Sequence, residues 1–249
     1  MKTGKNTMTK LTTLLVSISL LLGACSESSE STQTPTTSNS SSSQATTQGG
    51  SCLVDYQAEP WTLFSLEEVA VFVGLAANNG KMDEPIEMKN LSSRVAGYKW
   101  DTGRSMTTEF TGDMKIPVED TVVIGRFDIL DPTKINGSFV EHFSNQYRTL
   151  TEQEQSQFDA QFAKQLDNES EVAQDFAQGI SNITKSINYH TITGIGNAAI
   201  WQTNLKSPDG LLNVLHKNTT FVVVTNLSDD RNYNKEIAKK IALAVIEKC

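Results

Sequence analysis

The segment LLNVLHKNTTFVVVT, residues 211–225, carries a clear strand pattern. Two apolar segments, residues 211–216 and 220–225, lie on either side of a short link at Lys217-Asn218, and this spacing is typical of a β-hairpin. Residues 221–224 are Phe-Val-Val-Val and do not alternate with polar residues. A strand of this kind is usually buried on both faces. The sequence therefore predicts a hairpin whose second strand is covered on both sides.

Further strand signals occur upstream of the hairpin. β-Branched and aromatic residues are frequent at 95–102, 121–127 and 198–205, and residues 106–110 alternate after a turn at Asp101-Thr102-Gly103. We expect these segments to pair as an antiparallel sheet.

The first helix has clear boundary signals. Ser65 is suited to cap the helix, and Glu68, three residues later, completes a capping box. Phe64 can pack onto Val69 as a hydrophobic staple, and Gly74 suits the left-handed residue that follows a helix. These signals predict a short helix that is packed on one face.

A long apolar stripe predicts helical structure in the middle of the chain. It starts at Thr151, with Glu154 in capping-box register, and a polar stretch at 167–170 interrupts it, so it forms either one long bent helix or a pair. We interpret the stripe as core rather than as a partner-binding face. Its residues are Phe158, Phe162, Leu166, Val172, Phe176, Ile180, Ile183 and Ile187.

A last helix is predicted near the end of the chain. Tyr233, Ile237, Ile241 and Val245 recur at every fourth position. Together with the strands, the helices predict an α+β fold in which an antiparallel sheet is flanked by helices.

The first 24 residues have the features of a secretory signal. Three lysines precede an apolar run at 11–22, which is too short to span a bilayer because a spanning helix takes about 20 residues. Leu22-Gly23-Ala24-Cys25 resembles the lipobox of bacterial lipoproteins, in which the cysteine thiol receives a diacylglyceryl group before cleavage in front of it. The resemblance implies lipid attachment at Cys25. The alternative is an ordinary signal peptide with a cysteine at its cleavage site.

A polar segment follows at 26–51. Sixteen of its 26 residues are Ser or Thr, and none has a large apolar side chain. Such a segment cannot bury enough surface to offset its ordering entropy. We expect a signal peptide at 1–24, a lipidated cysteine and disordered linker at 25–51, and a globular domain at 52–249. By resemblance to Gram-negative lipoproteins, Ser26 in place of Asp implies release to the outer membrane in such a host.

Two cysteines remain besides Cys25. Cys52 and Cys249 lie at the two ends of the expected domain. In an oxidising envelope we expect them to form a disulfide. Intermolecular pairing and free thiols are the alternatives. A second cysteine pair, as in the usual four-ligand structural zinc site, is not present.

The charge balance bears on the partners. Loss of the three signal lysines lowers the basic residues from 21 to 18 against 29 acidic ones, a net charge near −11. Nucleic acids and anionic lipids attract basic surfaces, so this balance argues against both as partners.

Five segments occur in this order along the chain: LFSLEEVAVFVG, YKW, ITGIGNAAIW, LLNVLHKNTTFVVVT and EIAKKIALAVIEK. Together they resemble a domain of unknown function that occurs in bacterial lipoproteins, best known from actinobacteria. Two family cysteines are replaced here by Trp61 and Lys99, so a terminal disulfide would stand in for the internal one. The helical middle at 151–187 is longer than the family pattern needs. The resemblance implies an α+β fold and an envelope location, and it implies no known activity.

The motifs of common enzyme classes do not occur in this sequence. It contains no Gly-x-Ser-x-Gly, no His-Glu-x-x-His, no phosphate-binding loop and no Cys-x-x-Cys. We interpret His142, His190 and His216 as unrelated residues rather than as one metal site, with His190 in a turn and His216 in a hairpin strand. We therefore expect no catalytic residue, no metal and no cofactor.

Three other patterns have ordinary structural interpretations. Residues 230–234 open like a calcium-binding loop, but Lys235 and Ile241 stand where that loop needs Gly and Glu. Gly194-Ile195-Gly196-Asn197 is typical of a tight turn rather than of a phosphate site. Trp100 and Trp201 are expected to be buried in the sheet, with an apolar groove as the alternative.

The sequence is compatible with two kinds of function. The first is a membrane-anchored, non-catalytic binding module of the cell envelope that recognises an envelope protein, a lipid or a small ligand. The alternative is an envelope hydrolase or metal-dependent enzyme whose site residues are scattered along the sequence.

Overall fold

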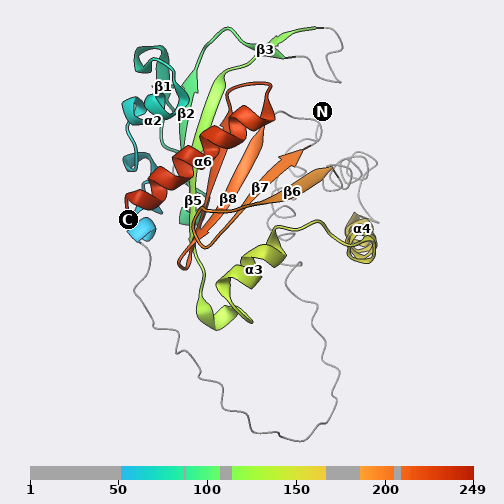
Figure 1. Ribbon diagram of the computed structural model, residues 1–249. Coiled ribbons are helices and arrows are strands. Elements are labelled where there is room, and N and C mark those ends of the chain that lie inside the picture. Colours follow the sequence, from blue (N-terminus) through green and yellow to red (C-terminus); the bar gives the residue numbers. More distant parts are fainter. Residues whose placement is uncertain (1–51, 87, 107–113, 167–185, 205–208) are drawn as a thin grey trace, which may run out of the picture. The chain divides into compact units, whose positions relative to one another are not determined.

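The computed structural model describes residues 52–86, 88–106, 114–166, 186–204 and 209–249 (Figure 1). The predictions for Cys25, the linker, Thr108, Phe110 and residues 167–185 lie outside these ranges. Within them, the chain has the predicted α+β fold, an antiparallel sheet with helices packed against it. No helix in the described ranges combines the length and the apolar character that crossing a bilayer requires.

Seven strands form the main sheet. Their order across the sheet is β1-β2-β5-β9-β8-β7-β6, and all neighbours are antiparallel. The strands are β1 (Gly80–Met82), β2 (Val95–Trp100), β5 (Asp120–Ile129), β6 (Ile187–Ile192), β7 (Ala198–Asn204), β8 (Gly210–His216) and β9 (Thr219–Asn226). Strands β2, β5, β7, β8 and β9 therefore overlap the segments predicted at 95–102, 121–127, 198–205, 211–216 and 220–225.

The predicted hairpin is confirmed at the centre of this sheet. β8 and β9 pair up to His216 opposite Thr219, and Lys217 adopts a positive φ of 57° in the link. Phe221, Val222 and Val223 are all buried, although successive side chains point to opposite faces of a strand. β9 is therefore covered on both sides, as its sequence predicts.

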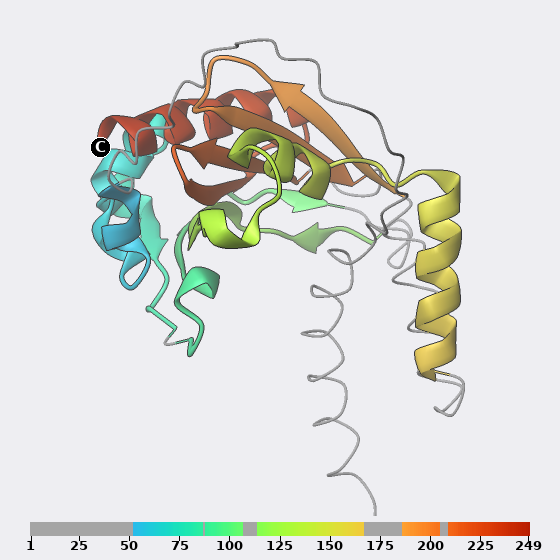
Figure 2. The same ribbon diagram turned by 90° about the horizontal axis from the view of Figure 1, so that it is seen from below.

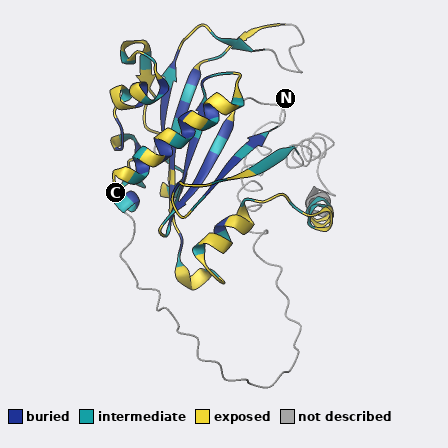
Figure 3. Cartoon of the chain, viewed as in Figure 1, coloured by how far each residue is buried: buried dark blue, intermediate teal, exposed yellow. Residues whose placement is uncertain are grey.

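One face of the sheet is covered by α2 (Leu66–Val73) and α6 (Arg231–Glu247). α6 crosses the strands in Figure 1 and, in red, follows one side of the sheet in Figure 2. Ile237, Ile241 and Val245 of its predicted stripe are buried, whereas Tyr233, the first residue of that stripe, is exposed. The outward surface of the helix is also exposed (Figure 3). The main core lies in this layer.

The other face of the sheet carries α3 (Phe139–Gln146), which packs over β7 and β8. Phe143 is fully buried there against Ile200 and Leu215. Ile200 alternates with Ala199 and Trp201 of the main core, so it points to the opposite side of β7. This helix was not predicted.

α4 (Glu152–Leu166) begins at its predicted capping box. The Thr151 backbone N–H donates to Glu154 Oε2 at 2.9 Å, and the Glu154 backbone N–H donates to Thr151 Oγ1 at 3.3 Å. Phe158 of the expected stripe is half-buried. The side chains of Phe162 and Leu166 lie outside the described residues.

The prediction for Ile187 and His190 is wrong. The sequence pattern predicts Ile187 in a helical stripe and His190 in a turn, but both belong to β6. The sequence Ile-Asn-Tyr-His-Thr-Ile alternates with strand period, and β6 pairs along its whole length with β7. Tertiary pairing with β7 therefore decides the structure of this segment.

The segment after β2 does not join the main sheet as expected. β3 (Ser105–Met106) forms a separate two-stranded sheet with β4 (Ile116–Pro117). The preceding residue, Arg104, donates from Nε to Asp120 Oδ1 at 2.6 Å and from Nη2 to the Asn226 carbonyl oxygen at 3.0 Å. These bonds fix Arg104 at the ends of β5 and β9, so β3 leaves the main sheet.

The two ends of the described domain meet. Cys52 and Cys249 form a disulfide, with their Cα atoms 5.6 Å apart. Nearby, Lys248 Nζ lies 2.9 Å from Glu68 Oε1 and 5.0 Å from the centre of the Phe64 ring. The last helix is thereby attached to the segment that begins the domain and to the start of α2.

Candidate functional site

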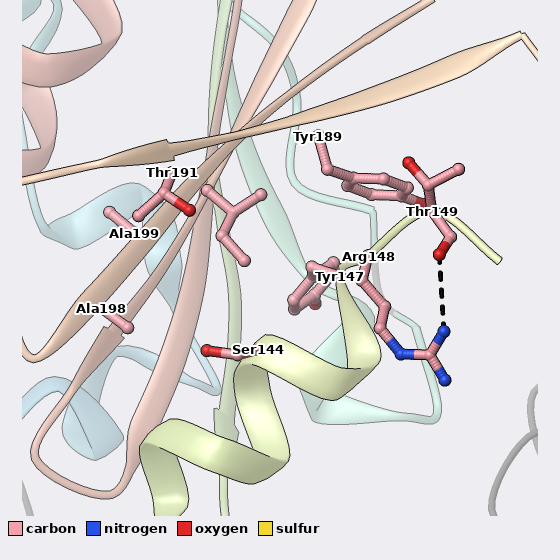
Figure 4. Close-up of a pocket in the computed structure, with 9 residues that line it drawn as sticks. Ser144, Tyr147, Arg148, Thr149, Tyr189, Thr191, Ala198 and Ala199 are labelled. Atoms are coloured by element: carbon pink, nitrogen blue, oxygen red, sulfur yellow. Dashed lines mark hydrogen bonds between the residues drawn. The ribbon is translucent and has the colours of Figure 1, made fainter. Parts of the chain in front are cut away.

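A small pocket lies between the end of α3 and the strands β6 and β7 (Figure 4). Its volume is about 240 Å³. We call it the α3–β6 pocket. It is lined by Ser144, Tyr147, Arg148, Thr149, Tyr189, Thr191, Ala198, Ala199 and Ile200.

α3 positions one wall of the pocket. The helix starts at a capping box in which the Glu141 backbone N–H donates to Ser138 Oγ at 3.1 Å, and Glu141 Oε2 accepts from the Ser138 backbone N–H at 2.9 Å. Phe143 then anchors the helix to the sheet, and its ring centre lies 4.9 Å from that of Tyr147. Because Tyr147 is the C-terminal capping residue, the chain that follows it turns away and forms the rim.

β6 supplies the opposite wall. Tyr189 and Thr191 lie opposite Gln202 and Ile200 of β7, so their side chains share the face of the sheet that α3 covers. His190 lies opposite Trp201 and points to the other face. The alternation of β6 thus places an aromatic ring and a hydroxyl beside the pocket and directs the imidazole away from it.

Hydroxyl groups dominate the polar lining. Five lining residues carry a side-chain hydroxyl. Within the described ranges, none of these hydroxyls takes part in a hydrogen bond. These residues are Ser144, Tyr147, Thr149, Tyr189 and Thr191. Burial raises the pKa of Tyr147 and of Tyr189, so both phenols stay protonated at physiological pH and can donate as well as accept.

The charge at the rim is balanced. Arg148 Nη1 lies 2.8 Å from Glu154 Oε2, and Nη2 contacts the other carboxylate oxygen. Arg148 also donates to the Thr149 carbonyl oxygen at 3.4 Å (Figure 4). The hydrogen bonds from Arg148 lower the pKa of Glu154, which therefore remains ionised beside the guanidinium. The pocket thus carries no unbalanced charge from this pair.

The three histidines belong to different elements. His142 lies in α3, and His190 lies exposed in β6. His216 is half-buried at the end of β8, in the hairpin strand where it was predicted. Burial lowers the pKa of His216. Across the described ranges, no three or more His, Cys, Asp or Glu side chains are grouped so that they could hold a metal ion.

The two tryptophans, the glycines before β7 and Asp230 have structural roles. Trp100 and Trp201 are buried in the main core, as expected, and do not line a groove. Gly194 and Gly196 have positive φ values of 81° and 56° in the turn between β6 and β7. Asp230 caps α6 by accepting from the Asn232 backbone N–H at 2.9 Å.

The sequence alone does not predict the pocket. Neither Tyr147 nor Tyr189 lies in a site motif, although two signals indicate the elements that carry them. One is the Ser138–Glu141 capping-box spacing before Tyr147, and the other is the strand-like alternation around Tyr189. The expected disulfide partners, Cys52 and Cys249, do meet in the structure.

No protein-family model, no curated protein and no solved structure matches this chain.

Proposed function

We propose that this chain is a lipid-anchored protein of a bacterial cell envelope and that its folded part is a non-catalytic binding module. The lipobox-like sequence ending at Cys25 supports the anchor. If the host is Gram-negative, Ser26 favours the outer membrane.

The pocket is the observation that carries the binding role. Two tyrosine rings, five side-chain hydroxyls and the Arg148 guanidinium, which is paired with Glu154, line a pocket of about 240 Å³ on a scaffold of packed sheet and helix. Known ligand sites combine apolar walls with a few oriented polar groups in this way. A fixed scaffold lowers the entropy lost when a ligand binds. The arrangement therefore suits recognition of a small ligand near the membrane.

The anchor is tested by metabolic labelling with a fatty-acid analogue in cells that express the full chain. We expect label on the wild type and on the control variant Ser29→Ala, and none on Cys25→Ala. Acyl chains contribute about 0.8 kcal/mol per buried CH₂, so unlabelled Cys25→Ala should also leave the membrane fraction. Equal label on Cys25→Ala and the wild type would refute the anchor.

A further inference from the structure

We propose that the α3–β6 pocket binds one uncharged sugar ring of an envelope glycan. This inference rests on the proposed binding function and names the class of its ligand. Four properties of the pocket lead to it: its aromatic walls, its hydroxyls, its charge and its size.

The aromatic walls offer an apolar surface with a polar rim. Tyr147 and Tyr189 are half-buried and pack against the cluster that contains buried Ile200. A pyranose ring has faces of C–H groups and an edge of hydroxyls, so it can contact a tyrosine ring and the Ile200 methyl groups while its hydroxyls stay at the edge. Tyrosine suits such a site because its ring is apolar and its tip is polar.

The hydroxyls complement the edge of the sugar. Each of the five lining hydroxyls can donate one hydrogen bond and accept two. A sugar hydroxyl has the same capacity, so a bound ring could pair with several of them at once. An apolar ligand would instead displace water from these groups and leave them unpaired, which is costly.

The charge disfavours ionic ligands. The Glu154 carboxylate already pairs with the Arg148 guanidinium, so it would repel an anion that approached Arg148. The guanidinium would in turn repel a cation that approached Glu154. Both tyrosines remain neutral, as described above. An uncharged ligand has no such conflict with the rim.

The size limits the ligand to one ring. The pocket volume of about 240 Å³ lies below the range of about 300–1,000 Å³ that is usual for sites of drug-sized molecules. Ser144, Thr149 and Thr191 are exposed, so the neighbouring sugars of a longer glycan could continue over the rim.

The test uses the full chain in lipid nanodiscs and saturation-transfer NMR with methyl α-D-glucopyranoside, methyl α-D-galactopyranoside and methyl α-D-mannopyranoside. We expect at least one glycoside to bind, with a dissociation constant of about 1 mM or weaker for a single ring. Tyr189→Phe removes one pocket hydroxyl and should weaken binding about three- to tenfold, the usual effect of a neutral hydrogen bond. Tyr189→Ala should abolish detectable binding.

Tyr233→Phe is the matched control because it removes a tyrosine hydroxyl from α6, where the hydroxyl donates to the Val73 carbonyl oxygen. It should leave glycoside binding unchanged, and circular dichroism should show that each variant is folded. Inorganic phosphate is the anionic probe. Binding of phosphate in place of the glycosides, or glycoside binding that Tyr189→Ala does not alter, would overturn the sugar assignment.

A second probe separates this inference from the proposed function. N-phenyl-1-naphthylamine is uncharged and apolar, and its fluorescence rises in apolar sites. If it binds, the glycosides do not, and Tyr189→Ala removes its signal, the pocket is a binding site and only the sugar assignment is wrong. If no probe binds to the folded chain, the binding-module proposal is overturned as well.

Discussion

Two tryptophans fill the main core because a glycine lies against each of them. A β-carbon on Gly210 would overlap Cζ2 and Cη2 of the Trp201 indole, and one on Gly80 would overlap the Trp100 indole. Both indoles are almost fully buried. The glycines thus leave room for large side chains that a seven-stranded sheet could not otherwise accept at these positions.

Gly210→Ala should therefore destabilise the domain. Overpacking of this kind costs about 1–3 kcal/mol in the free energy of unfolding, measurable by urea denaturation. In a Trp201→Phe background the overlapping indole atoms are absent, so the same substitution should cost less. An equal cost in both backgrounds would contradict the steric explanation.

Three helices start with a capping box. α2, α3 and α4 each begin with a Ser or Thr whose side chain caps the helix and a Glu three residues later that accepts from the capping backbone N–H. The sequence revealed two of these boxes, at Ser65 and Thr151. It did not reveal α3, because only Phe143 is buried in that eight-residue helix and no apolar stripe follows the box.

The three glutamates predict an acid-sensitive fold. Hydrogen bonds from the Ser65 and Ser138 backbones lower the pKa of Glu68 and Glu141, and Arg148 lowers that of Glu154. The unfolded chain then binds more protons than the folded chain, so stability is lost as pH falls below the ordinary value of about 4.5. Exposure and solvent screening reduce the size of this effect.

Urea denaturation between pH 3 and pH 7 measures this loss of stability. The free energy of unfolding should be nearly constant above pH 5.5 with respect to these groups and should decrease below pH 4.5. The triple variant Glu68→Gln, Glu141→Gln, Glu154→Gln keeps an acceptor oxygen in each box but cannot titrate, so its decrease should be shallower. An unchanged slope in the triple variant would contradict this account.

The strand order explains why the fold was largely predictable and the pocket was not. The central strands are predicted from local composition, because an unbroken apolar run such as Phe221, Val222 and Val223 is stable only where both faces of the strand are covered, and all three residues are buried. Tyr147 and Tyr189 belong to elements that meet only because β6 joins the sheet edge beside β7 and α3 packs across β7 and β8. Neither tyrosine carries a local signal of the other's position.

A disulfide joins the two ends of the domain at residues 52 and 249. The Cys52–Cys249 disulfide spans 197 positions of sequence, and the Lys248–Glu68 contact lies beside it. In the chain-entropy treatment a loop of this length stabilises the folded state by roughly 5 kcal/mol, and measured values are often smaller.

Reduction should therefore lower the melting temperature. A loss near the full value corresponds to about 10–20 °C for a domain of this size. The oxidised domain should also migrate faster than the reduced one on a denaturing gel, and thiol titration of the unfolded, unreduced domain should find neither Cys52 nor Cys249 free. Two titratable thiols, or a dimer band, would show that the bond does not form within one chain in solution.

Removal of metal ions by a chelator should not lower the melting temperature. The described core is built from apolar side chains, and its potential metal ligands are spread over separate elements. Binding of a structural metal would add to the free energy of folding, so its removal would be visible in a thermal scan. We expect EDTA to leave the melting temperature of the domain unchanged in non-reducing buffer. A clear drop with EDTA would identify a metal site and favour an enzymatic role.

The closing disulfide also governs how the protein responds to proteases. A single backbone cut anywhere between Cys52 and Cys249 leaves two fragments that stay covalently joined. If the chain is anchored at Cys25, as proposed, both fragments also remain attached to the membrane. Release of the whole domain then requires a cut in the segment between the lipid and Cys52, so the sequence of that segment sets how readily the domain is shed.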